Sequence, residues 1–335
     1  MYLCKMKNNA FRTEIQHKKA VAAITHNDSI MLIGSCFAEN IGAKLTDYKF
    51  HTAMNPFGIL FNPASIAQSL DILTDTTFQF AEEHLHFYNN EWFSFFHHGK
   101  FSHTDKKICL DNINTTLENS RLFLNKTHFL IITLGSAMVY SYQGNIVANC
   151  HKLPQKEFDK SMLEADEISS KLLNSIRKIK EINPKIQIIL TVSPVRYIKY
   201  DMVENTLNKA NLIVAVHQLI QKIDNSFYFP AYEIMMDELR DYRFYADDMI
   251  HPSPLSINYI WEKFAEAFFD KSTLAANGMI HKILLAKNHR MKNPNSGTSR
   301  IFKTEQIQKI RRIQYIYPTI SFKEELNYFS LDETI

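Results

Sequence analysis

Three stretches of continuous apolar residues, each followed by a turn, constrain the fold of this chain more than any other feature. They are SIMLI at 29–33, HFLIITL at 128–134 and IQIILTV at 186–192. Strands without polar alternation are buried on both faces, as in a parallel sheet. Amphipathic helical patterns lie between them in the chain. We therefore predict an α/β fold in which helices cover both faces of a parallel sheet.

The expected helices follow from apolar residues at helical spacing, with turn residues between the periodic stretches. They lie at 36–46, 64–73, 110–124, 161–182, 203–223 and 254–269. We also expect a short strand at 227–229, a hairpin or edge pair at 92–103 around Gly99, and a hairpin at 139–147. Two Asn-Pro steps predict a largely irregular segment at 50–63. Ser253 and Pro254 are typical of an N-cap and a first helical position.

The composition excludes several classes of protein. Hydrophobic residues make up 45% of the chain and only 8 residues are glycine, which excludes collagen-like and low-complexity sequences. No stretch reaches the roughly 18 to 20 apolar residues of a membrane span, and residues 1–15 lack the apolar centre of a signal peptide. Four widely spaced cysteines form no disulfide framework, which suits a reducing compartment. We expect a cytoplasmic protein.

The charge is distributed unevenly along the chain. Residues 271–335 hold 11 lysines and arginines against 5 acidic residues, although the whole chain has a formal charge of only +3. A basic tail can bind nucleic acid. Here the charges alternate with Ile, Leu and Phe, which is typical of solvated helix faces, so we expect no nucleic-acid partner. We predict a body at 11–270 and a basic, mostly helical extension at 271–335 with a break at 293–297.

Functional residues in parallel sheets lie where the strands end, which singles out Gly34-Ser35, Gly135-Ser136 and Ser193-Pro194. Ser35 follows a strand and a glycine and begins a helix, where an exposed hydroxyl meets the positive end of the helix dipole. A nucleophilic serine needs a base, and Asp248-Met249-Ile250-His251 places a carboxylate three residues before a histidine. Alone, an ordinary capping serine and a surface loop would explain both features.

The order of several motifs resembles the GSCFA family, which is itself similar to the SGNH (GDSL-type) hydrolases. The motifs cover about residues 11–270: FRTE at 11–14, GSCFAENIG at 34–42, NPFGILFNP at 55–63, TLGSA at 133–137, NCHK at 149–152, TVSPVR at 191–196 and DDMIHPS at 247–253. The resemblance implies a flavodoxin-like, three-layer α/β/α fold and an esterase, lipase or acyltransferase activity. It implies a catalytic triad of Ser35 as nucleophile, His251 as base and Asp248 as the residue that orients it.

The resemblance also implies an oxyanion hole, in which this sequence departs from the pattern. The amide of Ser35 and Gly58 are expected donors, and Gly135 marks the next motif. Two residues after that glycine, the SGNH pattern has an asparagine, whereas this chain has Ala137. Loss of one such donor typically lowers the rate by about 10²–10³. The candidate replacements are Asn55, Asn149 and His151, and Arg196 is a candidate for binding an anionic substrate group.

Several alternatives use the same or neighbouring residues. Cys36 is a second candidate nucleophile, although we expect its side chain to point away from Ser35. Cys150 with His151, and the histidines at 84, 86, 97, 98 and 103, lack the partners of a metal site, so we expect no metal and no cofactor. The aromatic residues between 87 and 96 are expected to pack under an insertion, with a wall for an acyl or glycan substrate as the alternative.

We predict a serine hydrolase acting on a small-molecule or glycan ester. The rival hypotheses are an SGNH-like module that binds a glycan or another ligand without turnover, and an enzyme that transfers an acyl group to a sugar. Three scarce glycines, Gly34, Gly58 and Gly135, fall in the loops expected around the site. We predict that a Cβ there damages activity more than stability.

Overall fold

The computed structural model describes residues 13–15, 22–197, 201–289, 293 and 296–330. Its central sheet is parallel throughout, in the order β10-β9-β5-β1-β2. The strands are β1 (Ser29–Gly34), β2 (His51–Met54), β5 (Phe129–Leu134), β9 (Gln187–Val192) and β10 (Ser226–Phe229). All six residues of β1 and of β5 are buried, which confirms the expectation drawn from continuous apolar stretches.

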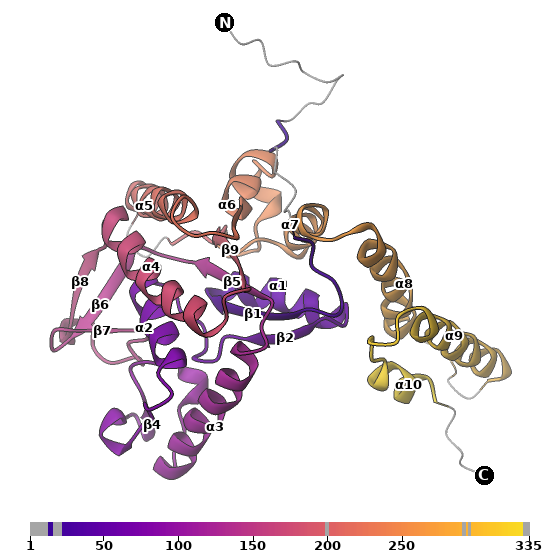
Figure 1. Cartoon of the computed structure of the whole chain (residues 1–335), viewed down its shortest axis with the longest axis horizontal. Helices are drawn as coiled ribbons and strands as arrows, with labels where there is room; N and C mark the ends of the chain where they lie inside the picture. Colours follow the sequence, from indigo (N-terminus) through magenta and orange to yellow (C-terminus); the bar gives the residue numbers. More distant parts are fainter. Residues whose placement is uncertain (1–12, 16–21, 198–200, 290–292, 294–295, 331–335) are drawn as a thin grey trace, which may run out of the picture.

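Helices cover both faces of the sheet, so the fold is a three-layer α/β/α arrangement (Figure 1). One face packs on α2 (Pro63–Thr74), α3 (Lys106–Leu124), α4 (Ala165–Ile182) and α5 (Met202–Ile220). The other packs on α1 (Cys36–Asp47), α7 (Pro254–Phe268) and the short α6 (Ala231–Glu233). Ser253 caps α7, as predicted, by accepting a hydrogen bond from the amide of Ser256.

Two small antiparallel sheets lie outside the central one. They consist of β3 (His86–Tyr88) with β4 (Glu91–Phe93), and of β6 (Met138–Tyr142) between β7 (Asn145–Val147) and β8 (Phe158–Met162). The hairpin expected at 139–147 is confirmed. The other hairpin turns at Asn89-Asn90 rather than at Gly99, although Trp92 and His103 do form an isolated bridge.

Two strands were not expected from the sequence. Residues 50–63 are largely irregular, as predicted, but contain β2, a short, largely exposed edge strand whose four residues carry no strand pattern. The helix expected from residue 161 begins instead at Ala165, because Ser161 and Met162 pair with β6 as part of β8. In both cases, pairing with a distant strand decided the local structure.

Three further helices, α8 (Lys271–Asn288), α9 (Gly297–Ile316) and α10 (Lys323–Phe329), lie together at one side of the molecule (Figure 1). They share an apolar cluster that includes Ile280, Ile310 and Phe329. Lys49 and Lys287 reach the buried carboxylate of Glu325 at 2.8 and 3.2 Å. The division at residue 270 stays a prediction, and the first two residues of FRTE lie outside the described ranges.

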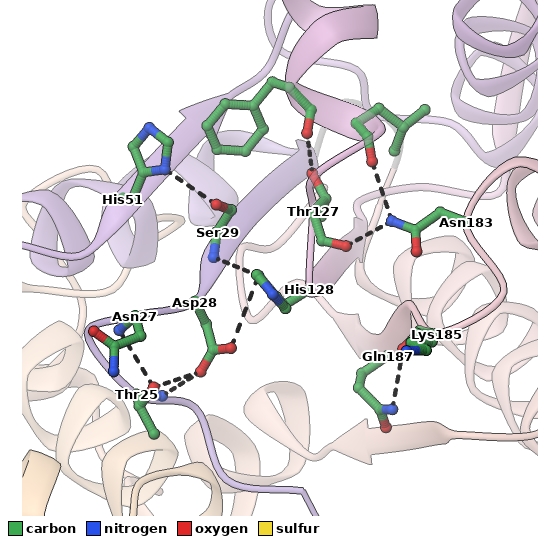
Figure 2. Close-up of polar contacts among 12 residues, drawn as sticks. Thr25, Asn27, Asp28, Ser29, His51, Thr127, His128, Asn183, Lys185 and Gln187 are labelled. Carbon is green, nitrogen blue, oxygen red and sulfur yellow. Dashed lines mark hydrogen bonds and ion pairs between the residues drawn. The ribbon is translucent and has the colours of Figure 1, made fainter.

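Polar contacts hold the amino-terminal edge of the sheet (Figure 2). The amide of Ser29 donates to Nδ1 of His128 at 3.0 Å, and Oδ1 of Asp28 lies 3.8 Å from the same nitrogen. The side-chain amide of Asn183 donates to the carbonyl of Thr127 at 2.7 Å. These contacts lie at the amino-terminal ends of the strands. The candidate site lies at the opposite, carboxyl-terminal ends. None of the helices in the described ranges is long and apolar enough to cross a membrane.

Candidate active site

Ser35 lies at the junction of β1 and α1. Its backbone is extended, it occupies the N-cap position of α1, and its side chain makes no capping hydrogen bond. The residue is only 1% exposed, and within the described residues its Oγ has no hydrogen-bond partner. A buried hydroxyl without a partner costs stability, which is typical of a side chain kept for function.

A cavity of about 520 Å³ opens over Ser35 at the carboxyl ends of β1, β5 and β9. Of the predicted site residues, it brings together Ser35, Gly135, Arg196 and His251. The remaining lining residues are Cys36, Ile59, Phe61, Ser136, Ser193, Val195, Tyr197 and Ile250. All three strand ends singled out from the sequence therefore contribute to one cavity. Asn55, Gly58, Asn149 and His151 do not line it.

Asp248 holds His251 in a tight turn before α7. Oδ2 of Asp248 lies 2.6 Å from Nδ1 of His251, and Oδ1 accepts the amides of Ile250 and His251 at 2.9 Å each. These amides and the imidazole lower the pKa of Asp248 to about 2, with the amide of His251 as the largest cause. The carboxylate is therefore ionised at neutral pH. Because Nδ1 is occupied, Nε2 is the ring nitrogen left for proton transfer.

Asn55 and Gly58 build the turn below Ser35. Oδ1 of Asn55 accepts the amide of Gly34 at 2.9 Å, and the carbonyl of Asn55 accepts the amide of Gly58 at 2.7 Å. The expected amide donor of Ser35 is likewise occupied, since it bonds to the carbonyl of Thr133 at 3.1 Å. Hydrogen bonds within the fold therefore use two of the expected oxyanion donors.

Asn149 and His151 belong to an aromatic cluster away from the cavity. Oδ1 of Asn149 accepts the amide of His151 at 2.8 Å, which closes a local turn. The His151 ring stacks on Phe93 at a centroid distance of 4.1 Å, and burial lowers its pKa to about 4. Phe93 and Phe95 are buried, in agreement with a packing role. Neither Asn149 nor His151 therefore lines the cavity over Ser35, where a replacement for the missing asparagine would have to act.

Arg196 follows β9 and connects the cavity to the His251 turn. Its amide donates to the carbonyl of Ile250 at 3.2 Å. Its guanidinium carbon lies 4.1 Å from the centroid of the Tyr245 ring and 5.4 Å from that of Tyr242. Such stacking holds the cation without neutralising it. The two tyrosines line a neighbouring hollow rather than the cavity over Ser35, and Arg196 is the residue that both share.

Cys36, the residue after Ser35, also lines the cavity. Burial raises its pKa above the ordinary value, with the Lys209 ammonium as the main opposing influence. A thiol with a raised pKa is a poor nucleophile at neutral pH. In the described part of the chain, no three His, Cys, Asp or Glu side chains gather closely enough to hold a metal ion.

Sequence reasoning missed Asn208 and Lys209 of α5. Both side chains are 1% exposed. The Lys209 ammonium donates to the carbonyls of Gly135 at 2.7 Å and Ser193 at 2.9 Å, directly behind the cavity. Their place in the helical pattern could have indicated that they are buried, because these polar residues lie on the same face of α5 as Leu212 and Val216.

Should His251 act as the base for Ser35 in ester hydrolysis, replacing Asp248 with asparagine is expected to lower kcat by about 10²–10⁴. The new amide nitrogen would face Nδ1 of His251 and favour the tautomer whose Nε2 carries the proton, so the ring could not accept the Ser35 proton. Steady-state kinetics measures the effect, with Asp247→Asn, a change at the exposed neighbouring residue, as the control. Equal kcat values for the two variants would contradict this role.

The buried Lys209 is expected to make stability depend on pH. Burial lowers its pKa from 10.5 to about 7, so between these values the unfolded chain binds more protons than the folded one. The wild type should therefore gain up to about 1.4 kcal/mol of unfolding free energy per pH unit, relative to Lys209→Met, from pH 7 to pH 10. Urea unfolding at several pH values measures this. Lys178→Met, which removes a half-exposed lysine, is the control, and parallel curves for Lys209→Met and the wild type would refute the prediction.

The chain is thus an α/β protein in which a serine and a histidine line one cavity at the carboxyl ends of the strands, and an aspartate hydrogen-bonds to that histidine. Residues 29–264 match the model of the GSCFA family. The chain belongs to the GSCFA family. No curated protein matches the chain.

Among solved structures, the chain is similar to three esterases. A family 3 carbohydrate esterase from Talaromyces cellulolyticus is 9% identical, with 71% of this chain and 95% of that one covered and a TM-score of 0.35. The family 3 carbohydrate esterase of Clostridium thermocellum is 11% identical over 72% and 94%, with a TM-score of 0.34. An acetyl esterase mutant with acetate ion is 9% identical over 76% and 99%, with a TM-score of 0.36. TM-scores this low establish no shared activity.

Proposed function

We propose that this protein is a serine hydrolase that cleaves esters through an acyl-enzyme on Ser35. The observation that carries the proposal is that Ser35 and His251 line one cavity while Asp248 holds Nδ1 of the same histidine at 2.6 Å. Catalytic hydrogen bonds in a free enzyme often tighten only when substrate binds, so the unpartnered Ser35 Oγ is compatible with this role.

In the proposed reaction, Ser35 Oγ attacks the ester carbonyl and its proton passes to Nε2 of His251. The tetrahedral intermediate collapses, the C–O bond to the leaving alcohol breaks, and the alcohol takes that proton from His251. Water then attacks the acyl-enzyme, with the same nitrogen as base. Hydrolysis of the acyl-enzyme releases a carboxylic acid and restores Ser35. Asp248 keeps its charge throughout and stabilises the imidazolium.

The walls of the cavity favour an acyl group longer than acetyl. Ile59, Phe61, Val195 and Ile250 line it, and Arg196 is the charged side chain beside them. A volume of about 520 Å³ exceeds what an acetyl group needs. We expect the acyl chain to contact the apolar residues and an anionic part of the substrate to lie beside Arg196.

Labelling with a fluorophosphonate tests the nucleophile directly, because such reagents modify only activated serines. Mass spectrometry is expected to find the label on Ser35 in the wild type and not in Asp248→Asn. A series of chromogenic esters from acetyl to octanoyl then tests the acyl site, with kcat/KM expected to rise beyond acetyl. An unlabelled Ser35 would favour the rival hypothesis of a binding module without turnover.

A further inference from the structure

The segment that joins β5 to β6, residues 135–138 with Met138 as the first residue of β6, lies where the SGNH-like pattern has its asparagine donor, and is called the loop below. It packs directly against the nucleophile, since a Cβ built on Gly135 would lie 3.1 Å from Cβ of Ser35. Ala137 cannot supply a side-chain hydrogen bond. The existing hydrogen bonds of the loop determine which of its N–H and O–H groups can still donate to a substrate in the cavity.

All four backbone amides of the loop are already used. The amides of Gly135 and Ser136 both donate to the carbonyl of Phe61 at 2.9 Å. The amide of Ala137 donates to Oδ1 of Asn208 at 2.6 Å, and the amide of Met138 donates to Oγ of Ser136 at 3.0 Å. No backbone N–H of this loop is therefore left for a substrate.

The Ser136 hydroxyl is different, because both of its acceptor positions are filled. The Ala137 amide must meet an oxygen, which fixes the orientation of the Asn208 side chain and turns its nitrogen toward Ser136. That Nδ2 donates to Ser136 Oγ at 2.9 Å, in addition to the bond from Met138. A hydroxyl has two lone pairs and one hydrogen, so the hydrogen points away from both nitrogens and remains available to another acceptor. Among the described residues, no protein atom accepts it, and Ser136 lines the Ser35 cavity.

We propose that the Ser136 hydroxyl is a catalytic hydrogen-bond donor to the oxyanion formed on Ser35, in place of the asparagine that this chain lacks. Asn208 is the positioning residue that turns this hydroxyl hydrogen toward the cavity. The inference rests on the proposed function, since it assumes an ester carbonyl attacked by Ser35. Ser136 keeps its proton throughout, and the bond it donates strengthens as negative charge develops on the carbonyl oxygen.

Ser136→Ala is the first test. It is expected to lower kcat by about 10²–10³ with KM nearly unchanged, because the lost bond acts mainly in the transition state. Fluorophosphonate labelling of Ser35 should slow without disappearing. The matched control is Ser175→Ala, which removes a buried hydroxyl on α4 whose bonds go to the carbonyls of Ala67 and Lys171. This control should leave kcat at the wild-type value.

Asn208→Asp tests the direction of the bond. The carboxylate still accepts the Ala137 amide but can only accept from Ser136, so the hydroxyl hydrogen turns away from the cavity. We expect kcat to fall as it does in Ser136→Ala, and the double variant to be no slower than Ser136→Ala alone. Thermal unfolding of each variant identifies activity losses that are caused by misfolding. Asn208→Asp introduces a buried charge, whereas Ser136→Ala does not, so Ser136→Ala remains informative if Asn208→Asp fails to fold.

The outcomes separate this inference from the proposed function. If the wild type hydrolyses esters and labels at Ser35 while Ser136→Ala keeps the wild-type kcat, the oxyanion role is overturned and the hydrolase remains. If effects of Ser136→Ala and Asn208→Asp multiply in the double variant, the two residues act separately and the positioning role is overturned. If the wild type neither labels nor turns over, the proposed function and this inference fail together.

Discussion

Ser35→Ala is expected to lower kcat for ester hydrolysis by about 10⁴–10⁶ while raising the free energy of unfolding by about 1 kcal/mol. Activity falls because the nucleophile is gone. Stability rises because Ser35 Oγ is buried without a hydrogen-bond partner among the described residues. Its removal therefore leaves no other polar group unpaired. Steady-state kinetics and urea unfolding of the same preparation measure both effects.

Cys36→Ala accompanies this experiment, because Cys36 lines the same cavity. If Cys36 were the nucleophile, its alanine variant would lose turnover and Ser35→Ala would keep it. A structural serine would give a third result, in which Ser35→Ala lowers stability and leaves turnover intact. Opposite changes in activity and stability at Ser35 are therefore specific to the proposed role.

Gly34→Ala is expected to destabilise the folded state by at least about 3 kcal/mol. The backbone φ of Gly34 is +141°, which L-residues rarely adopt, and a Cβ there would lie 2.1 Å from the carbonyl oxygen of Thr133 on the neighbouring strand. The strands would have to separate where β1 meets β5. Urea unfolding measures the loss, and we expect little folded protein near 37 °C.

Gly278→Ala in α8 is the matched control, since nothing lies within 4 Å of the Cβ it would add. It should stabilise the helix by about 0.5–1 kcal/mol. Equal stabilities for Gly34→Ala and the wild type would show that the strands yield easily. The sequence led us to expect activity losses above stability losses at Gly34, Gly58 and Gly135. At Gly34 that expectation conflicts with the steric contact, and at Gly58 a Cβ would lie 2.3 Å from Cβ of His98.

Elements with strong periodicity were predictable from the sequence. The buried strands β1, β5 and β9 and the helices between them follow from patterns that are local in the chain. The strands β2 and β8 were missed because each is short and half-exposed, and is held by pairing with a strand about 16 to 24 residues away in the chain. Propensity and periodicity cannot detect such pairing.

The candidate site divides in the same way. Ser35, Asp248 and His251 were found because each lies in a local motif, a strand end or a turn of four residues. Asn208 and Lys209 were not, because they lie inside a helix whose pattern predicts only packing. Their contacts with residues 135–137 and 193 join segments about 70 and 16 residues apart, and no local pattern carries such information.

The sequence by itself determined the parallel α/β fold and the strand ends that line the candidate cavity, because burial periodicity and turn residues act over a few neighbours. Only the tertiary structure decided which donors remain for a substrate. The amides of Ser35 and Gly58, predicted as donors, bond within the fold, whereas the hydroxyl of Ser136 has both lone pairs filled and a hydrogen to donate. A hydrogen bond has one hydrogen and a direction, and that direction is set by partners that only folding brings together.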